Sequence, residues 1–188
     1  MNANVLFARI ASPLGKLLLV GEPSRDLLAL RGVYFDGAPH SEAAVPGGAR
    51  EDVMAFAGVV EQLEAYFEGE RTSFDIDLEP RGTEFQREVW RALSTIPYGE
   101  TTTYAEIAAA IGKPSAVRAV GAANGRNPLS IIVPCHRVIG RDGTLTGYAG
   151  GIDNKRKLLA LESRRRPSMR PSSPMKRGNR ERKLMAES

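Results

Sequence analysis

The stretch TTTYAEIAAAIGKPSAVRAVGAANG, residues 101–125, contains two short helical segments separated by a Gly-Lys-Pro turn at 112–114. Thr103, with Glu106 three residues later, is a capping-box pattern and predicts that the first helix begins there. The second helix is predicted over 114–125. Two short helices joined by a glycine-containing turn favour a helix-turn-helix unit.

The second of these helices is almost bare of long side chains. Arg118 is the one long charged residue in its middle. A helix that reads bases in the major groove usually carries several long polar side chains. This helix suits instead a close approach to the minor groove with one inserted arginine, although tight packing against another helix would also favour small residues. The small residues are Ser115, Ala116, Ala119, Gly121 and Ala122.

Upstream of this unit the chain has the pattern of a separate α/β domain. Apolar runs separated by Pro, Gly, Ser and Asp predict a strand meander, and an apolar stripe with spacings of three and four predicts an amphipathic helix. The expected strands are 4–10, 16–20, 27–35 and 72–80, and the expected helix is 51–68. A boundary near 80–82 closes a first domain over 1–81, and Thr83 with Gln86 forms another capping box at the start of the next helix.

Downstream of the helix-turn-helix, the apolar run SIIVP at 130–134 predicts a buried strand. A glycine-rich loop over 141–151 and a last helix over 152–162 follow. These elements predict a mostly α second domain over 82–162. Residues 163–188 contain nine Lys or Arg, two Glu and few apolar residues, which predicts a basic, disordered tail.

The composition is that of a soluble globular protein, with 42% hydrophobic and 26% charged residues among 188. No apolar run approaches the roughly 20 residues that span a bilayer, and the first residues lack a signal-peptide pattern. We therefore expect a cytoplasmic protein without a membrane partner. The single cysteine excludes an internal disulfide, and two histidines far apart in sequence make a metal site unexpected.

The segment IIVPCHRVIG, residues 131–140, places the single cysteine, Cys135, directly before His136. A thiolate is the reactive form of cysteine, and histidine titrates in the range needed to take its proton. Neighbouring side chains on a strand point to opposite faces, so contact between the two needs a turn, which Pro134 would favour, or a bridging water. Because free cysteine is also among the most buried residue types, the pattern is equally that of a core strand end.

Several motifs resemble those of the methylated-DNA–protein-cysteine methyltransferases, which repair guanine alkylated at O6. The motifs are PCHRV (134–138), GRNP (125–128), AVRAVG (116–121), PYGETTTYAEIA (97–108) and GYAGG (147–151). Their order and spacing match the family across 82–162. The resemblance implies a ribonuclease-H-like first domain, which the N-terminal strands and helix suit only loosely, and a second domain with a winged helix-turn-helix-like DNA-binding unit.

The resemblance implies that Cys135 accepts the alkyl group in one displacement and becomes a thioether. With no second cysteine and no cofactor to regenerate it, the protein would act once. His136 would serve as base through a water, and Glu162 would orient the histidine. Asn127 would brace the cysteine turn and the helix-turn-helix.

The resemblance also assigns contacts to the substrate base and to DNA. Tyr104 would hydrogen-bond the flipped guanine, and the Val138 carbonyl would read its amine. Tyr148 and Ala149 would form the wall of the base pocket, although some family members have Ser where this chain has Ala149. Arg118 would fill the hole left by the flipped nucleotide, on the helix whose small residues approach the DNA.

The expected partner is double-stranded DNA containing alkylated guanine, bound by a protein that is monomeric in solution, with cooperative binding on DNA left open. The alternatives are a non-catalytic alkylated-DNA lesion-binding protein, a Cys-His-Glu hydrolase and a helix-turn-helix regulator. The presence of Cys135 argues against the lesion-binding protein, and nothing in the sequence points to an acyl substrate. The bare helix argues against a regulator that reads bases.

Overall fold

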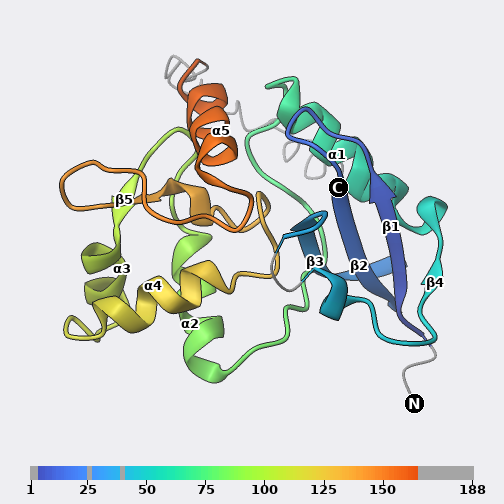
Figure 1. Cartoon of the computed structure of the whole chain (residues 1–188), viewed down its shortest axis with the longest axis horizontal. Helices are drawn as coiled ribbons and strands as arrows, with labels where there is room; N and C mark the ends of the chain where they lie inside the picture. The colour runs from blue at the N-terminus through green and yellow to red at the C-terminus, as the bar shows by residue number, and fades with distance from the viewer. Residues whose placement is uncertain (1–3, 25–26, 39–40, 165–188) are drawn as a thin grey trace, which may run out of the picture.

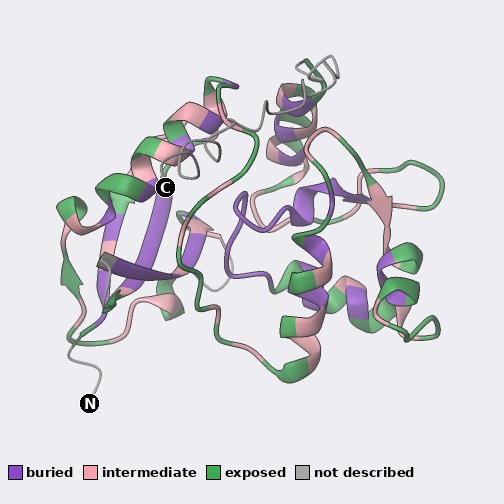
Figure 2. Ribbon diagram, turned by 180° about the vertical axis from the view of Figure 1, so that it is seen from behind, coloured by how far each residue is buried: buried purple, intermediate pink, exposed green. Residues whose placement is uncertain are grey.

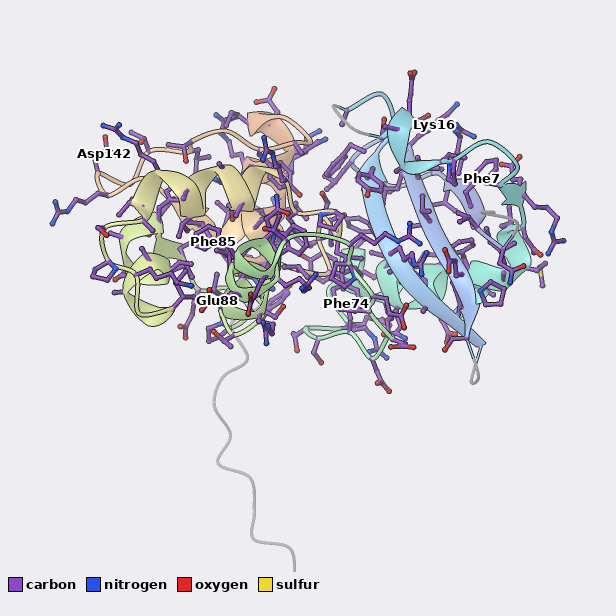
Figure 3. All side chains as sticks on the ribbon, turned by 90° about the horizontal axis from the view of Figure 1, so that it is seen from below. Phe7, Lys16, Phe74, Phe85, Glu88 and Asp142 are labelled. Carbon is purple, nitrogen blue, oxygen red and sulfur yellow. The ribbon has the colours of Figure 1, made fainter. Side chains whose placement is uncertain are left out.

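The computed structural model describes residues 4–24, 27–38 and 41–164. A half built on a β-sheet and a half built on helices lie side by side (Figure 1). Phe7 and Lys16 project from the sheet half, Phe85 and Glu88 from the helical half, and Asp142 lies at its far end (Figure 3). The predicted division into an α/β first half and a mostly helical second half is confirmed.

The sheet has the strand order β3-β2-β1-β4. Its antiparallel strands β1 (Leu6–Ile10), β2 (Leu17–Ser24) and β3 (Leu27–Phe35) confirm the predicted meander. The two-residue strand β4 (Arg50–Glu51) pairs with β1 in parallel, and the sequence does not predict it.

One face of the sheet is covered by helix α1 (Ala57–Phe67), which follows a 3-10 turn at Val53–Phe56 and confirms the helix expected over 51–68. Val53, which the spacing assigns to the apolar stripe, is 50% exposed. Because the 3-10 turn has fewer residues per turn than an α-helix, it changes which residues of this segment face the sheet. That face consists of Phe56, Val59, Leu63 and Tyr66.

The strand predicted over 72–80 is wrong, because only one β-bridge forms there, between Leu30 and Leu78. Leu30 N donates to Asp77 O at 2.8 Å, and Glu79 N donates to Leu30 O at 2.9 Å. Pro80 follows and has no N–H to continue the ladder. The chain then crosses to the helical half.

The second half packs α2 (Glu84–Leu93), α3 (Tyr104–Ala110) and α4 (Val117–Gly125) on one another, with α5 (Ile152–Arg164) at its end. Both predicted capping boxes are present, at Thr83 before α2 and at Thr103 before α3. A short parallel pair, β5 (Thr102–Thr103) with β6 (Val138–Ile139), is not predicted by the sequence.

Residues 130–134 are buried as predicted, but they form no strand. The chain folds into successive tight turns, in which Val133 N donates to Leu129 O and Cys135 N to Val133 O, both at 2.8 Å. Ile131 has a φ of 74°. For a β-branched residue this left-handed conformation costs about 1–3 kcal/mol and persists only when its surroundings impose it. The strand prediction fails because a short buried apolar run does not distinguish extended from turned backbone.

Strand β3 joins the two halves of the molecule. Val33 N donates to Pro128 O at 2.8 Å, and Ser130 N donates to Val33 O at 3.0 Å. A Cβ placed on Gly150 would lie 2.4 Å from the ring of Phe35, so this loop packs on the sheet half with no room for a side chain. The coil at 127–134, which follows α4, is buried throughout and is drawn purple in Figure 2.

Helix α5 continues to Arg164, just past the predicted domain end at Glu162. The rest of the predicted tail, from residue 165, lies outside the described residues. Among the helices that the structure describes, none has the length and apolar character required to cross a membrane.

Candidate active site and nucleic-acid interface

Cys135 begins a short 3-10 turn, Cys135–Arg137, directly after Pro134. This is the turn that contact between Cys135 and His136 requires, since an extended backbone would point the two side chains apart. The thiol is almost fully enclosed, with 3% of the residue exposed. The sequence-based alternative of a buried cysteine is therefore correct about burial, and the surrounding contacts decide whether the thiol is inert.

Asn127 holds the thiol from the segment that follows α4. Its Nδ2 donates to Cys135 Sγ at 3.1 Å and to Val133 O at 2.9 Å, while its Oδ1 accepts from Leu129 N at 3.0 Å. Asn127 is itself buried, so it fixes the end of α4, the strained turn and the thiol as one unit. A core filler has no need of a buried amide donor directed at its sulfur.

His136 and Glu162 form a fully buried pair, each 0% exposed. His136 Nε2 lies 3.0 Å from Glu162 Oε1, and His136 Nδ1 has no hydrogen-bond partner among the described residues. An ionised carboxylate accepts hydrogen bonds only, so Nε2 carries the ring proton and Nδ1 presents its lone pair. The pair therefore supplies a base at Nδ1.

Glu162 is the most heavily bonded group in the site, and three of its donors are not predicted from the sequence. Arg137 donates through Nε and Nη2 at 2.9 and 2.8 Å, Tyr66 through its hydroxyl at 2.7 Å, and Gly99 through its backbone N–H at 3.2 Å. Gly99 has a φ of 76°, and a Cβ there would lie 3.1 Å from Glu162 O, so both its conformation and its contact favour glycine. These bonds hold the carboxylate in one orientation.

The electrostatics of the site favour a neutral thiol and a neutral imidazole beside an ionised Glu162 that is paired with Arg137. Burial raises the pKa of Cys135, against the Asn127 hydrogen bond and the charge of Lys155. Burial also lowers the pKa of His136 despite its bond to Glu162. Burial alone would raise the pKa of Glu162, but hydrogen bonds from His136 and Arg137 outweigh it and bring the pKa to about 2. At neutral pH the resting state is thus a thiol and a neutral imidazole, so the nucleophile needs a base.

Lys155, which the sequence analysis does not single out, is fully buried on α5. Its Nζ donates to Val138 O at 2.6 Å and to Thr146 O at 3.1 Å, and Thr146 Oγ1 lies 2.8 Å from the Tyr104 hydroxyl. Lys155 therefore fixes the Val138 carbonyl, and Val138 itself is 0% exposed. The sequence does contain a signal for this lysine. Lys155 lies at helical spacing from Leu158 and Glu162, and the three residues form the buried face of α5.

Tyr148 and Ala149 come from the loop that was predicted to border the substrate. The Tyr148 ring lies 6.4 Å from the His136 ring and 5.6 Å from the Phe35 ring, between centroids. Burial raises the pKa of Tyr148, and the nearby Cys135 adds to the shift. Ala149 lines a cleft of about 240 Å³ between the two halves, together with Asn127.

Helix α4 presents the bare face that the sequence predicts. Ser115, Arg118, Ala119 and Ala122 are exposed, and Ala116 and Gly121 are half-buried. A Cβ on Gly121 would meet nothing closer than the ring of Tyr104, at 3.8 Å, which is an ordinary contact. Close helix packing therefore does not require glycine there, and that explanation of the small residues loses its support.

The described part of the chain holds no group of three or more His, Cys, Asp or Glu side chains that could bind a metal ion. The donors that do gather, His136 and Glu162, are bonded to each other and to Arg137.

Two family models match the chain along most of its length. The 6-O-methylguanine DNA methyltransferase ribonuclease-like domain matches residues 5–80, and the DNA binding domain of the same family matches residues 84–164. The chain belongs to the 6-O-methylguanine DNA methyltransferase family. The family predicted from PCHRV and its companion motifs is confirmed.

Relatives within this family cover both halves of the chain. A methylated-DNA–protein-cysteine methyltransferase of Mycolicibacterium paratuberculosis is 57% identical over 164 residues, which are 86% of this chain and 94% of the relative. One from Methanosarcina barkeri is 54% identical over 153 residues, covering 81% and 94%. The crystal structure of Mycobacterium tuberculosis OGT in complex with DNA has a TM-score of 0.78 and 52% identity, covering 87% of this chain and 96% of that one.

Proposed function

We propose that this protein repairs DNA by direct, stoichiometric transfer of the alkyl group from O6-alkylguanine to Cys135. The observation that carries the proposal is the buried arrangement of polar side chains around the thiol and the residue after it. Asn127 donates to the sulfur at 3.1 Å, and the next residue, His136, is bonded to Glu162 at 3.0 Å. Relatives that share over half of their residues carry the name of this activity.

In the proposed step, the Cys135 proton passes to His136 Nδ1 through a bridging water. The sulfur then attacks the alkyl carbon, so that a C–S bond forms while the bond from carbon to guanine O6 breaks. The guanine leaves as an anion and is protonated with the help of the Tyr104 hydroxyl. Full ionisation of an ordinary thiol gains only about 2 kcal/mol over its state at neutral pH, whereas proximity and orientation supply roughly 7–11 kcal/mol. Positioning of the base is therefore the larger contribution.

The thioether product is stable, and its reversal would require another nucleophile. Cys135 is the only cysteine in the chain, so no second thiol is present to release the alkyl group. The protein is accordingly a single-use reagent, without a cofactor.

Access to O6 requires the guanine to leave the base stack, because the target atom is buried in a duplex. We assign this task to α4, whose small exposed residues allow close approach to the minor groove and whose Arg118 is free to insert where the base was. The flipped base would lie against Tyr104, the Val138 carbonyl, Tyr148 and Ala149.

The proposal extends to the finer features of the fold and of the setting. We assign a ribonuclease-H-like first domain over 1–81, a winged helix-turn-helix-like second domain over 82–162 and a basic tail over 163–188. The ranges of the two matching family models support the first boundary. The partner is duplex DNA containing alkylated guanine, bound in the cytoplasm by a monomer.

A titration tests the proposal. A duplex containing one O6-methylguanine is mixed with increasing amounts of protein, and restored guanine is counted. We expect one guanine restored per protein molecule, then no further turnover, and none with C135S, which keeps the size of the side chain. Tight binding without restoration would indicate a lesion-binding protein, and repeated turnover of an ester would indicate a hydrolase.

A further inference from the structure

Glu162 receives a hydrogen bond from the other half of the molecule. Tyr66 lies on α1, and its hydroxyl donates to Glu162 Oε1 at 2.7 Å. The same oxygen atom is the partner of His136 Nε2 at 3.0 Å. Both Tyr66 and Glu162 are 0% exposed, so neither bond competes with solvent. The phenol and the imidazole thus share one acceptor atom.

The ring of Tyr66 is held independently of its hydroxyl. Its centroid lies 5.6 Å from that of Phe67, 5.3 Å from that of Phe74 and 6.0 Å from that of Tyr98. Aromatic packing of this kind stabilises the position of the ring without the polar group. Removal of the hydroxyl alone therefore leaves the packing in place and isolates the bond to Glu162.

Three donors share the negative charge of Glu162 Oε1, because Arg137 Nη2 donates to the same oxygen at 2.8 Å as the Tyr66 hydroxyl and His136 Nε2. The Tyr66 bond leaves less of that charge for the imidazole and so favours neutral His136, the form with a free lone pair at Nδ1. The other groups around His136 act on the same equilibrium. The titratable and charged groups facing this cluster are Glu162, Arg137, Lys155, Cys135, Tyr148, Tyr66 and Tyr98.

We propose that Tyr66 is a positioning residue for alkyl transfer. Through its hydroxyl, the N-terminal half sets the orientation and charge of Glu162 and, through Glu162, the basicity of His136. This role rests on the proposed function. It gives the first half a part in the chemistry, beyond the contacts of β3 with the turn before Cys135.

The test compares Y66F with wild type and with Y34F, which removes a hydroxyl from a tyrosine on β3 that makes no contact with Glu162. Single-turnover alkyl transfer from a methylated duplex is measured across pH, with DNA affinity measured separately. We expect Y66F to bind DNA as wild type does and to transfer about three- to tenfold more slowly near neutral pH. The acidic limb of the transfer rate of Y66F against pH should move to higher pH, because His136 loses the competing donor and holds its proton more strongly. Y34F should overlay wild type.

Histidine NMR gives a readout that a purely structural role would not change. The chain has only two histidines, so an H40Q background assigns the His136 signals. The His136 pKa should rise in Y66F and stay unchanged in Y34F. An unchanged His136 titration, or a Y66F rate lowered equally at every pH, would overturn the proposal. If wild type itself transfers no alkyl group, the proposed function fails, while the titration still decides whether Tyr66 tunes His136.

Discussion

The side-chain amide of Asn127 donates to the sulfur of Cys135 at 3.1 Å, and the same nitrogen donates to the Val133 carbonyl at 2.9 Å. One buried side chain therefore stabilises both the nucleophile and the turn that carries it. This link places the thiol at the point where α4 ends, so the helix proposed to face DNA and the reacting atom are connected through a single residue.

Replacement of Asn127 by Ala should reduce both stability and reactivity. The variant leaves Leu129 N buried without its partner and removes one of the two donors to Val133 O, which keeps its bond from Cys135 N, at a cost of about 2–4 kcal/mol in the free energy of unfolding. It also removes a hydrogen bond that lowers the pKa of Cys135, so alkyl transfer should slow. Urea unfolding and single-turnover transfer measure the two effects.

Asn154→Ala is the matched control for this variant. Among the described residues, the Asn154 side chain makes one hydrogen bond, to Leu14 O at 3.0 Å, and it is only partly buried. Its loss should cost no more than about 1.5 kcal/mol and leave transfer unchanged. Equal losses in N127A and N154A would contradict the role given to the Asn127 network.

The ionisation of Glu162 predicts a specific pH dependence of stability. Because the folded pKa is about 2 and the ordinary value is 4.5, the charged form is favoured by folding. That contribution, about 3 kcal/mol, is fully present above pH 5 or so and is lost as the pH falls towards 2. In E162Q this pH-dependent loss should disappear, and the protein should be less stable at neutral pH because Arg137 is left buried without a charged partner.

Chemical unfolding at several pH values between 2 and 7 measures this effect. Glu79→Gln is a suitable control, since Glu79 is 56% exposed and its bridge to Arg31 spans 3.7 Å. The control should retain the full acid dependence. An E162Q curve parallel to that of wild type over this pH range would show that Glu162 is not the group responsible.

Arg118 should matter more for duplex than for single-stranded substrate. If it fills the place of the flipped guanine, R118A must extrude the base without that replacement, which should slow transfer from duplex DNA by about 10- to 100-fold. A single-stranded oligonucleotide needs no such filling and should lose less. Arg156→Ala, an exposed arginine on α5 paired with Asp153, serves as control. An equal loss on both substrates would reduce Arg118 to a general charge contact.

Patterns between residues close in sequence predicted much of the secondary structure correctly. The strand expected over 130–134 failed because its conformation depends on distant contacts. The capping boxes at Thr83 and Thr103 place the starts of α2 and α3, because such patterns involve residues three apart. The turned backbone at 130–134, where a strand was expected, is imposed from outside the segment. Asn127 and the contacts of β3 hold it in place. The apolar pattern within the segment therefore could not predict contacts with residues outside it.

The site was predictable where a motif carries it and unpredictable where the contact is distant. PCHRV drew attention to Cys135 and His136, and the resemblance added Glu162 and Asn127. Tyr66 lies 96 residues from Glu162, in a stripe that has the pattern of an ordinary core face. A buried phenol needs a hydrogen-bond partner, so a polar neighbour could have been expected, but not which one.

The mass of the protein after reaction with a duplex containing O6-methylguanine tests alkyl transfer to Cys135 most directly. We predict a gain of one methyl group in place of one hydrogen, located on the peptide that contains Cys135, with no gain in C135S. A protein that restores guanine while Cys135 stays unmodified, or that carries the methyl group on another residue, would show that Cys135 is not the alkyl acceptor.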